Sequence, residues 1–232
     1  MDDERPDLTL LTALPFETAL ARRLGLRRHA GAPLPCHTGR VGNLRAALCE
    51  TGLGAERLER MANSPLLRPA LGLVSTGLAG GLAPGLRAAA VIVPAGVAGG
   101  AGRLPADSFL RGVFAAAGAI PVNLIASSGG IVATPEAKRE LRAATRADAV
   151  DMESGVIGSW AEAHGIAFAV VRAISDPAGA ALPPGIAGGP RTDPLRALTR
   201  FFFLGLRALA ARRALARVVR GACARLAPLP AE

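Results

Sequence analysis

The chain has few of several residue types, and each scarcity excludes a class of protein. Its 232 residues include only three cysteines, Cys36, Cys49 and Cys223, without C-x-x-C spacing, so neither a disulfide framework nor a zinc site is indicated. It has one tryptophan and no tyrosine, and therefore lacks the basic and aromatic interleaving typical of nucleic-acid binding. We expect no metal, no cofactor and no nucleic-acid partner.

The chain also has no long apolar run near its beginning. The opening residues MDDERPD are acidic and are followed by only a short apolar stretch. This pattern predicts neither a signal peptide nor a transmembrane helix. With no disulfide framework indicated, it favours a reducing, cytoplasmic location.

Half of the residues are hydrophobic, enough to bury one sizeable core. Apolar runs punctuated by glycines alternate with helical spacing, which predicts a single-domain, three-layer α/β/α fold with a mostly parallel mixed central sheet. We expect strands near 8–13, 41–50, 71–76, 89–95, 121–127, 148–152 and 167–174. We expect helices near 16–24, 54–63, 107–118, 135–144, 153–164 and 194–222.

Two segments rich in glycine, proline and alanine, 94–105 and 177–190, interrupt this alternation. Such composition predicts flexible loops. Both follow the ends of expected strands on the same side of the sheet, so we expect them to border a functional site.

The segment Ala149–Pro177 carries the densest polar signal. A short strand ends near Met152, a helix follows to His164, and an apolar, β-branched strand ends before Ser175 and Asp176. Ligands of open α/β sheets bind beyond the carboxyl ends of the strands. We therefore expect Glu153 and Asp176 to lie across one pocket.

Four segments resemble segments of the nucleoside phosphorylase and nucleosidase superfamily, and they follow one another along the chain in the same order as in that family. They are Val150–Glu153, Val171–Asp176, the first strand and turn Leu8–Glu17, and the glycine-rich turn Ser75–Leu82. The resemblance implies that family's fold and cleavage of the glycosidic bond between a ribose and a purine.

The resemblance assigns chemistry to three residues. Asp176 matches the acid that protonates the departing purine, Ser175 would orient it, and Glu17 aligns with the carboxylate that activates the attacking water in hydrolytic members. The local alternatives are plainer. Asp176 alone would be a residue of a turn at the end of a strand, and Glu17 alone an acidic residue in the first turn of a helix.

Other matching residues imply substrate contacts. Glu153 corresponds to the carboxylate that binds the ribose hydroxyls, Met152 would pack on the sugar, and Arg172 is expected to pair with a carboxylate beneath the site. Asp151 stands where many relatives have glutamate. The remaining predicted binding residues are Ile131 and Val132 beside the base, and Thr76, Gly77 and Leu78 in the glycine-rich turn.

The residues of that turn favour water over phosphate as the nucleophile. Ser75 stands where hexameric phosphorylases carry an arginine, and Leu78 where serine is common. Phosphate as a co-substrate remains an alternative, because the turn has backbone donors and Arg22, Arg23 or Arg45 could reach it.

The segment 94–105 is shorter and less aromatic than the loop that closes over the 5′ end of the substrate in methylthioadenosine nucleosidases. This favours a bulky apolar 5′ group. With Leu182-Pro183-Pro184, it makes the chain resemble the hopanoid-biosynthesis-associated phosphorylase/nucleosidase group, which implies adenosylhopane as substrate. The alternatives are a methylthioadenosine or adenosylhomocysteine nucleosidase, and a non-catalytic binding module at a membrane surface.

The C-terminal segment 212–232 extends the last helix beyond a catalytic domain over 1–211. Residues 212–226 place arginines 213, 217 and 220 on one face and apolar residues on the other. Such a helix suits peripheral contact with an anionic inner membrane face, or packing on the body or on a subunit of a homo-oligomer. The net charge of +9 fits both, and the arginine excess, with Lys138 the only lysine, also suits a compositional origin.

Overall fold

The computed structural model describes residues 5–99, 102–182 and 194–226, with side chains for all of these except residues 16 and 194–208. The strands are β1 Leu8–Thr12, β2 Arg27–Arg28, β3 Cys36–Val41, β4 Leu44–Glu50, β5 Gly72–Gly81, β6 Val91–Gly99, β7 Gly102–Pro105, β8 Ile120–Ser127, β9 Ala149–Asp151 and β10 Phe168–Asp176. The helices are α1 Pro15–Thr18, α2 Leu20–Leu24, α3 Ser108–Ala116, α4 Pro135–Thr145, α5 Ser154–Ala163 and α6 Pro194–Arg225.

These strands form one mixed sheet. β1 pairs in parallel with β4 and β5, and β10 pairs in parallel with the other side of β5. β10 also pairs antiparallel with β6, β8 joins β6 to β9, and β9 returns to the end of β5. Strands β5, β10, β6, β8 and β9 therefore close into a ring, and β1, β4, β3 and β2 extend the sheet from it.

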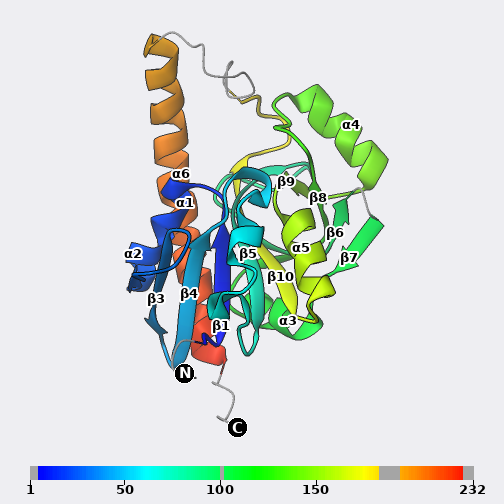
Figure 1. Ribbon diagram of the computed structural model, residues 1–232. Coiled ribbons are helices and arrows are strands. Elements are labelled where there is room, and N and C mark those ends of the chain that lie inside the picture. The colour runs from blue at the N-terminus through cyan, green and yellow to red at the C-terminus, as the bar shows by residue number, and fades with distance from the viewer. Residues whose placement is uncertain (1–4, 100–101, 183–193, 227–232) are drawn as a thin grey trace.

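Helices cover both faces of the sheet (Figure 1). Leu10 of β1 belongs to a buried cluster with Phe114 of α3 and Val219 of α6, whereas the adjacent Leu11 belongs to a second cluster with Ile157 of α5. Neighbouring residues of one strand thus face opposite layers, as the period of a buried strand requires. The predicted three-layer α/β fold is confirmed.

The predicted helix over 54–63 is wrong. This segment makes short 3-10 turns at Leu53–Ala55 and Leu58–Met61, and a third turn follows at Pro65–Leu67. Gly54 takes a positive φ of 61°, and its N–H donates to Glu153 Oε1, 3.1 Å away. A left-handed residue whose amide is bound to another element does not continue an α-helix.

The predicted loop over 94–105 is also wrong in its described part. β6 continues to Gly99 and pairs antiparallel with β7, which begins at Gly102. The glycines make this pairing sterically feasible, because a β-carbon at Gly96 would lie 2.7 Å from the Leu104 carbonyl oxygen. Small residues here mark close strand contact rather than a flexible loop.

The glycine-rich segment 75–82 is likewise not a turn, because β5 runs through Gly81. Gly80 and Gly81 pair with Val150 and Ala149 of β9. Further differences concern boundaries: the predicted helix 16–24 is divided into α1 and α2, and the strand predicted over 41–50 begins at Leu44 after a separate strand, β3.

The last helix, α6, runs without interruption from Pro194 to Arg225, and its first half rises beyond the body of the molecule (Figure 1). Of the predicted loop over 177–190, Pro177–Leu182 is described, and Pro183 and Pro184 lie outside the described residues. Within the described residues, no helix combines the length and the apolar character needed to cross a membrane.

Candidate active site

A cavity of about 180 Å³ lies where β1, β5, β9 and β10 end. Most of the residues predicted for the site line it: Glu17, Leu78, Ile131, Val132, Met152, Glu153 and Ser175. The other residues that line it are Ala13, Leu14, Leu53, Ala79, Gly80, Gly130, Val150 and Asp151. The topology thus gathers segments that are far apart in the sequence.

Three of the predicted residues lie behind this wall. Asp176 is beneath Gly80, where an added β-carbon would be 3.4 Å from Asp176 Oδ2. Thr76 is buried, and its carbonyl accepts a hydrogen bond from Arg172 Nη1 at 3.2 Å. At Gly77, an added β-carbon would lie 2.4 Å from Glu17 Oε1, so only glycine fits there without displacing the carboxylate.

Glu17 is held by backbone amides. Its Oε2 accepts from the N–H groups of Ala13 and Leu14 at 3.0 and 3.1 Å, and its Oε1 accepts from Leu78 N–H at 2.8 Å. Burial raises the pKa of the Glu17 carboxyl above its usual value, although the Arg172 guanidinium and these amides oppose the rise. A carboxyl fixed in position with a raised pKa is suited to proton transfer.

Arg172 lies beneath the cavity and is fully buried. Its Nη2 is 2.7 Å from Asp151 Oδ2, 3.2 Å from Glu153 Oε2 and 2.8 Å from Ser75 Oγ. Burial alone would lower the pKa of Arg172, but the surrounding carboxylates raise it. As expected from the sequence, Arg172 supports the carboxylates from below.

Glu153 connects this buried network to the cavity. One carboxylate oxygen accepts from Gly54 N–H and the other from Arg172, which fixes the side chain at the cavity wall. Asp151, in turn, accepts hydrogen bonds from the backbone and the hydroxyl of Ser154 at the start of α5. The glutamate that faces the cavity is therefore held directly by two separate elements, the turn at Gly54 and strand β10.

One guanidinium serves three carboxyl groups here. The charges of Asp151, Glu153 and Glu17 raise the pKa of Arg172, in that order of effect. Among the described residues that line the cavity, none is positively charged. This end of the cavity therefore suits a ligand group that carries or develops positive charge.

The opposite end of the site contains an ion pair that the sequence did not predict. Lys138 of α4 is fully buried, and its Nζ is 2.5 Å from Asp176 Oδ2. Ser175 Oγ contacts the other carboxylate oxygen of Asp176 and lies 3.2 Å from the Ala79 carbonyl oxygen. The signal that could have indicated Lys138 is that it is the only lysine in an arginine-rich chain.

Lys138 also holds the segment after β10. Its ammonium donates to the carbonyl oxygens of Pro177 and Ala180 at 2.9 and 2.8 Å, and Leu182 N–H donates to Ala133 O at 2.8 Å. The ammonium thus has three acceptors, which satisfies all of its donors. It fixes both the Asp176 side chain and the segment that borders the cavity.

The mouth of the cavity is apolar. Ile131 and Leu53 line it and remain 42% and 48% exposed, although both are large hydrophobic side chains. Exposed apolar residues at a cavity rim mark a surface that a ligand can cover.

The arginines considered for gripping phosphate lie elsewhere. Arg22 and Arg23 line a separate hollow between α2 and α6, and Arg45 pairs with Asp7 at 3.2 Å.

Comparison with known proteins agrees with this architecture. Residues 110–220 match the family model described as the phosphorylase superfamily, and a sequence comparison with curated proteins finds no match. The chain is similar in structure to the 5′-methylthioadenosine/S-adenosylhomocysteine nucleosidase of Streptococcus pneumoniae in complex with 8-aminoadenine, with 20% identity, a TM-score of 0.74 and coverage of 95% of this chain and 100% of the other.

Two further structures show the same likeness. The corresponding nucleosidase of Neisseria meningitidis, in complex with methylthio-immucillin-A, has 20% identity, a TM-score of 0.70 and coverage of 92% of this chain and 98% of the other. The futalosine hydrolase of Helicobacter pylori has 18% identity, a TM-score of 0.70 and coverage of 91% and 96%. The family match over residues 110–220 spans both halves of the motif in Ala149–Pro177, and the fold of the chain is similar to that of these solved nucleosidases and hydrolase.

Proposed function

We propose that the protein is a nucleosidase that cleaves the bond between ribose and adenine in a nucleoside with a bulky apolar 5′ group. The observation that carries this proposal is the arrangement of charge around one cavity. Glu17 and Glu153 line it above a single guanidinium, and Asp176 with its lysine lies behind the wall at Gly80. Glycosidic cleavage develops positive charge on the sugar and negative charge on the base, so it requires two such ends.

At the sugar end, Glu153 accepts hydrogen bonds from the ribose hydroxyls. Its two oxygens each have one protein donor, and carboxylate oxygens have further lone pairs for a ligand. The negative charge of Glu153 and Glu17 favours the cationic sugar of the transition state more than the neutral ground state. Met152, also at the wall, packs against the ribose.

At the base end, Asp176 delivers a proton to the departing purine, and Ser175 orients its carboxyl. The ion pair with Lys138 keeps Asp176 as a carboxylate at rest, so Asp176 takes up this proton from solvent before the transfer, and the ion pair stabilises the carboxylate that remains afterwards. Asp176 is the cross-strand partner of Gly80, which lines the cavity, and this glycine carries no side chain that would separate the carboxyl from the cavity wall. Ile131 and Val132 hold the base from the apolar side.

Water is the proposed nucleophile. Glu17 would accept its proton, and the raised pKa of this carboxyl brings it closer to the pH at which it works. The absence of a cationic side chain among the described lining residues favours water over phosphate, which needs such partners.

The apolar mouth supports the proposed 5′ group. Ile131 and Leu53 expose apolar surface at the mouth. A methylthio group would cover only part of this surface, whereas a polycyclic hydrocarbon such as that of adenosylhopane would cover it. A methylthioadenosine or adenosylhomocysteine nucleosidase is the second candidate, favoured by the activities named for the structural neighbours.

One assay distinguishes these candidates. Free adenine is measured after incubation of the purified protein with adenosylhopane in detergent or with methylthioadenosine, each with and without phosphate. We expect release from adenosylhopane, with no dependence on phosphate. Faster release from methylthioadenosine would favour the second candidate, strict dependence on phosphate would identify a phosphorylase, and no release from either substrate would contradict the proposal.

Glu153→Gln should slow cleavage and weaken ribose binding. An amide keeps the shape but offers a poorer partner to two hydroxyls and to the developing cation, and loss of a charge-assisted hydrogen bond costs about 1.5–3 kcal/mol, or about 10- to 150-fold in kcat/KM. The check is kcat/KM for ribo and 2′-deoxy forms of one substrate. The deoxy form should lose less activity than the ribo form, and equal losses would argue against the hydroxyl contact.

Peripheral contact with an anionic membrane at the inner face, and assembly as a homo-oligomer, remain part of the proposal. The apolar face of residues 212–226 is packed into the core, as the burial of Leu215, Val219 and Ala222 shows. Insertion of that face into a bilayer is therefore inconsistent with the structure. Contact would have to use the arginine face of α6.

A further inference from the structure

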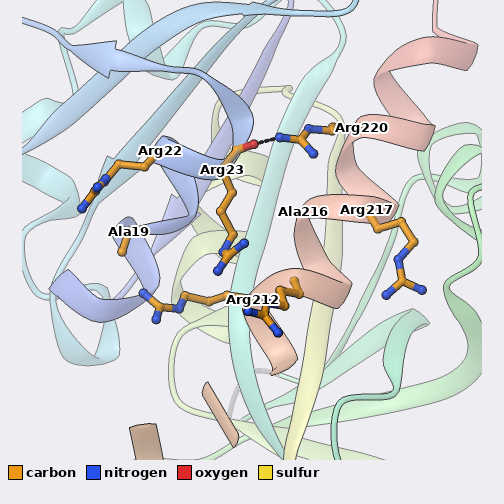
Figure 2. A pocket seen from close by; sticks show the side chains of 8 residues that line it. Ala19, Arg22, Arg23, Arg212, Ala216, Arg217 and Arg220 are labelled. Carbon is orange, nitrogen blue, oxygen red and sulfur yellow. Dashed lines mark hydrogen bonds between the residues drawn. The ribbon is translucent and has the colours of Figure 1, made fainter. Parts of the chain in front are cut away.

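A wide hollow lies apart from the proposed active site. It has a volume of about 810 Å³ and lies between the α1–α2 turn and the second half of α6. Apart from Ala19 and Ala216, its lining consists of Arg22, Arg23, Arg212, Arg213, Arg217 and Arg220. We call it the arginine hollow (Figure 2).

Two rigid elements bring these arginines together. Leu215, Val219 and Ala222 bury one face of α6 in the core, which turns arginines 213, 217 and 220 outward. On the other side, Leu20 and Leu24 anchor α2 in the same core cluster. The arrangement is therefore fixed by packing rather than by contacts among the charges.

The guanidinium groups surround the hollow from different directions. Figure 2 shows Arg220 reaching back to the carbonyl oxygen of Arg23, and Arg22 and Arg217 at opposite rims. Arg22 and Arg217 are exposed, and Arg23 is half-buried. Donors that remain at the rims can therefore meet a ligand from both helices at once.

The field in the hollow is strongly positive. Among the described residues that line it, none is acidic. Burial lowers the pKa of Arg212, and the nearby charge of Arg23 lowers it further. Six like charges around one hollow repel each other, and this arrangement is stabilised when an anion neutralises them.

We propose that the arginine hollow binds clustered phosphate groups, presented either by the headgroups of an anionic phospholipid surface or by a soluble polyphosphate. The planar fork of arginine matches the phosphate oxygens in two parallel hydrogen bonds. The hollow is larger than one phosphate requires, and the exposed arginines 22, 213 and 217 offer several forks. This site does not depend on the proposed nucleosidase activity, because it shares no lining residue with the cavity above Arg172.

The test compares the wild-type chain with two triple variants. The hollow variant is Arg22→Ala, Arg213→Ala, Arg217→Ala, and the control variant is Arg40→Ala, Arg103→Ala, Arg139→Ala. All six side chains are exposed, so neither variant is expected to unfold. Each variant loses three positive charges, so the two have the same net charge. Binding is measured by cosedimentation with phosphatidylglycerol or phosphatidylcholine vesicles, and by calorimetry with inorganic pyrophosphate.

We expect wild-type binding to phosphatidylglycerol vesicles to fall about 100-fold in the hollow variant and much less in the control, because each basic residue near an anionic surface contributes about 1 kcal/mol. Pyrophosphate binding that is lost only in the hollow variant would identify soluble phosphate as a sufficient ligand. Binding to the vesicles alone would identify the lipid headgroup.

Three results would overturn the proposal. The first is that the wild-type chain binds neither anionic probe. The second is that binding weakens equally in both variants, and the third is that binding is unchanged in the hollow variant. Adenine release from a water-soluble nucleoside, measured in the same proteins, should be alike in all three. That readout separates failure of the hollow from failure of the proposed nucleosidase.

Discussion

Asp176→Asn is expected to lower adenine release by about 10²- to 10⁴-fold, the contribution that general acid catalysis typically makes. The amide keeps the shape of the carboxyl, and its oxygen can still accept a hydrogen bond from Lys138. It cannot supply an acidic proton to the departing purine. The measurement is kcat for adenine release from the substrate that the wild-type enzyme cleaves best.

Asp148→Asn is a suitable control for this variant. Asp148 carries the same functional group but lies outside the cavity, where it pairs with Arg142 at 3.2 Å. We expect near wild-type turnover in the control and a folded Asp176→Asn protein by near-UV circular dichroism. Turnover close to wild type in folded Asp176→Asn would remove Asp176 from the mechanism.

The sequence predicted those parts of the site that are encoded contiguously. Met152 and Glu153 follow a short strand directly, and Ser175 and Asp176 end a buried one, so position along the chain already placed them at the same edge of the sheet. Arg172 was expected beneath the site, and it lies there in β10, with its Nη2 against Asp151 and Glu153. Local pattern was sufficient for these residues.

The glycine-rich segments show where local pattern failed. Glycine usually marks a turn, but in β5 and β6 it permits strands to approach other backbones or side chains closely. At Gly77 the neighbour is the Glu17 carboxylate, 61 positions away from Leu78, which also binds it. Only the tertiary structure distinguishes a glycine that turns from one that makes room.

Lys138 and the arginine hollow were missed for a related reason. Lys138 lies on a helix with a polar pattern, where a lysine is ordinarily solvated, and its acceptors come from the segment that follows another strand. The arginines of α6 were recognised as one face of a helix, but their partners on α2 are nearly two hundred residues away. Contacts of that range carry no periodic signal.

Lys138→Met should destabilise the protein strongly. The substitution keeps an unbranched side chain of similar length but leaves the buried Asp176 carboxylate without its cation and the Pro177 and Ala180 carbonyls without their donor. Removing one partner of a buried ion pair typically costs about 3–5 kcal/mol. The free energy of unfolding is measured by urea denaturation, with Arg139→Met, an exposed neighbour on α4, as the control of little expected effect.

The double variant Lys138→Met, Asp176→Asn completes a thermodynamic cycle. Because both charges are then absent, we expect it to be destabilised by less than the sum of the two single variants, with a coupling energy of at least about 1 kcal/mol. Additive losses would mean that the two groups do not pair in solution. The kcat of Lys138→Met should also fall, since its ammonium holds both Asp176 and the segment after β10 beside the cavity. Normal kcat in a destabilised Lys138→Met protein would instead confine Lys138 to a role in stability, with no part in positioning the acid.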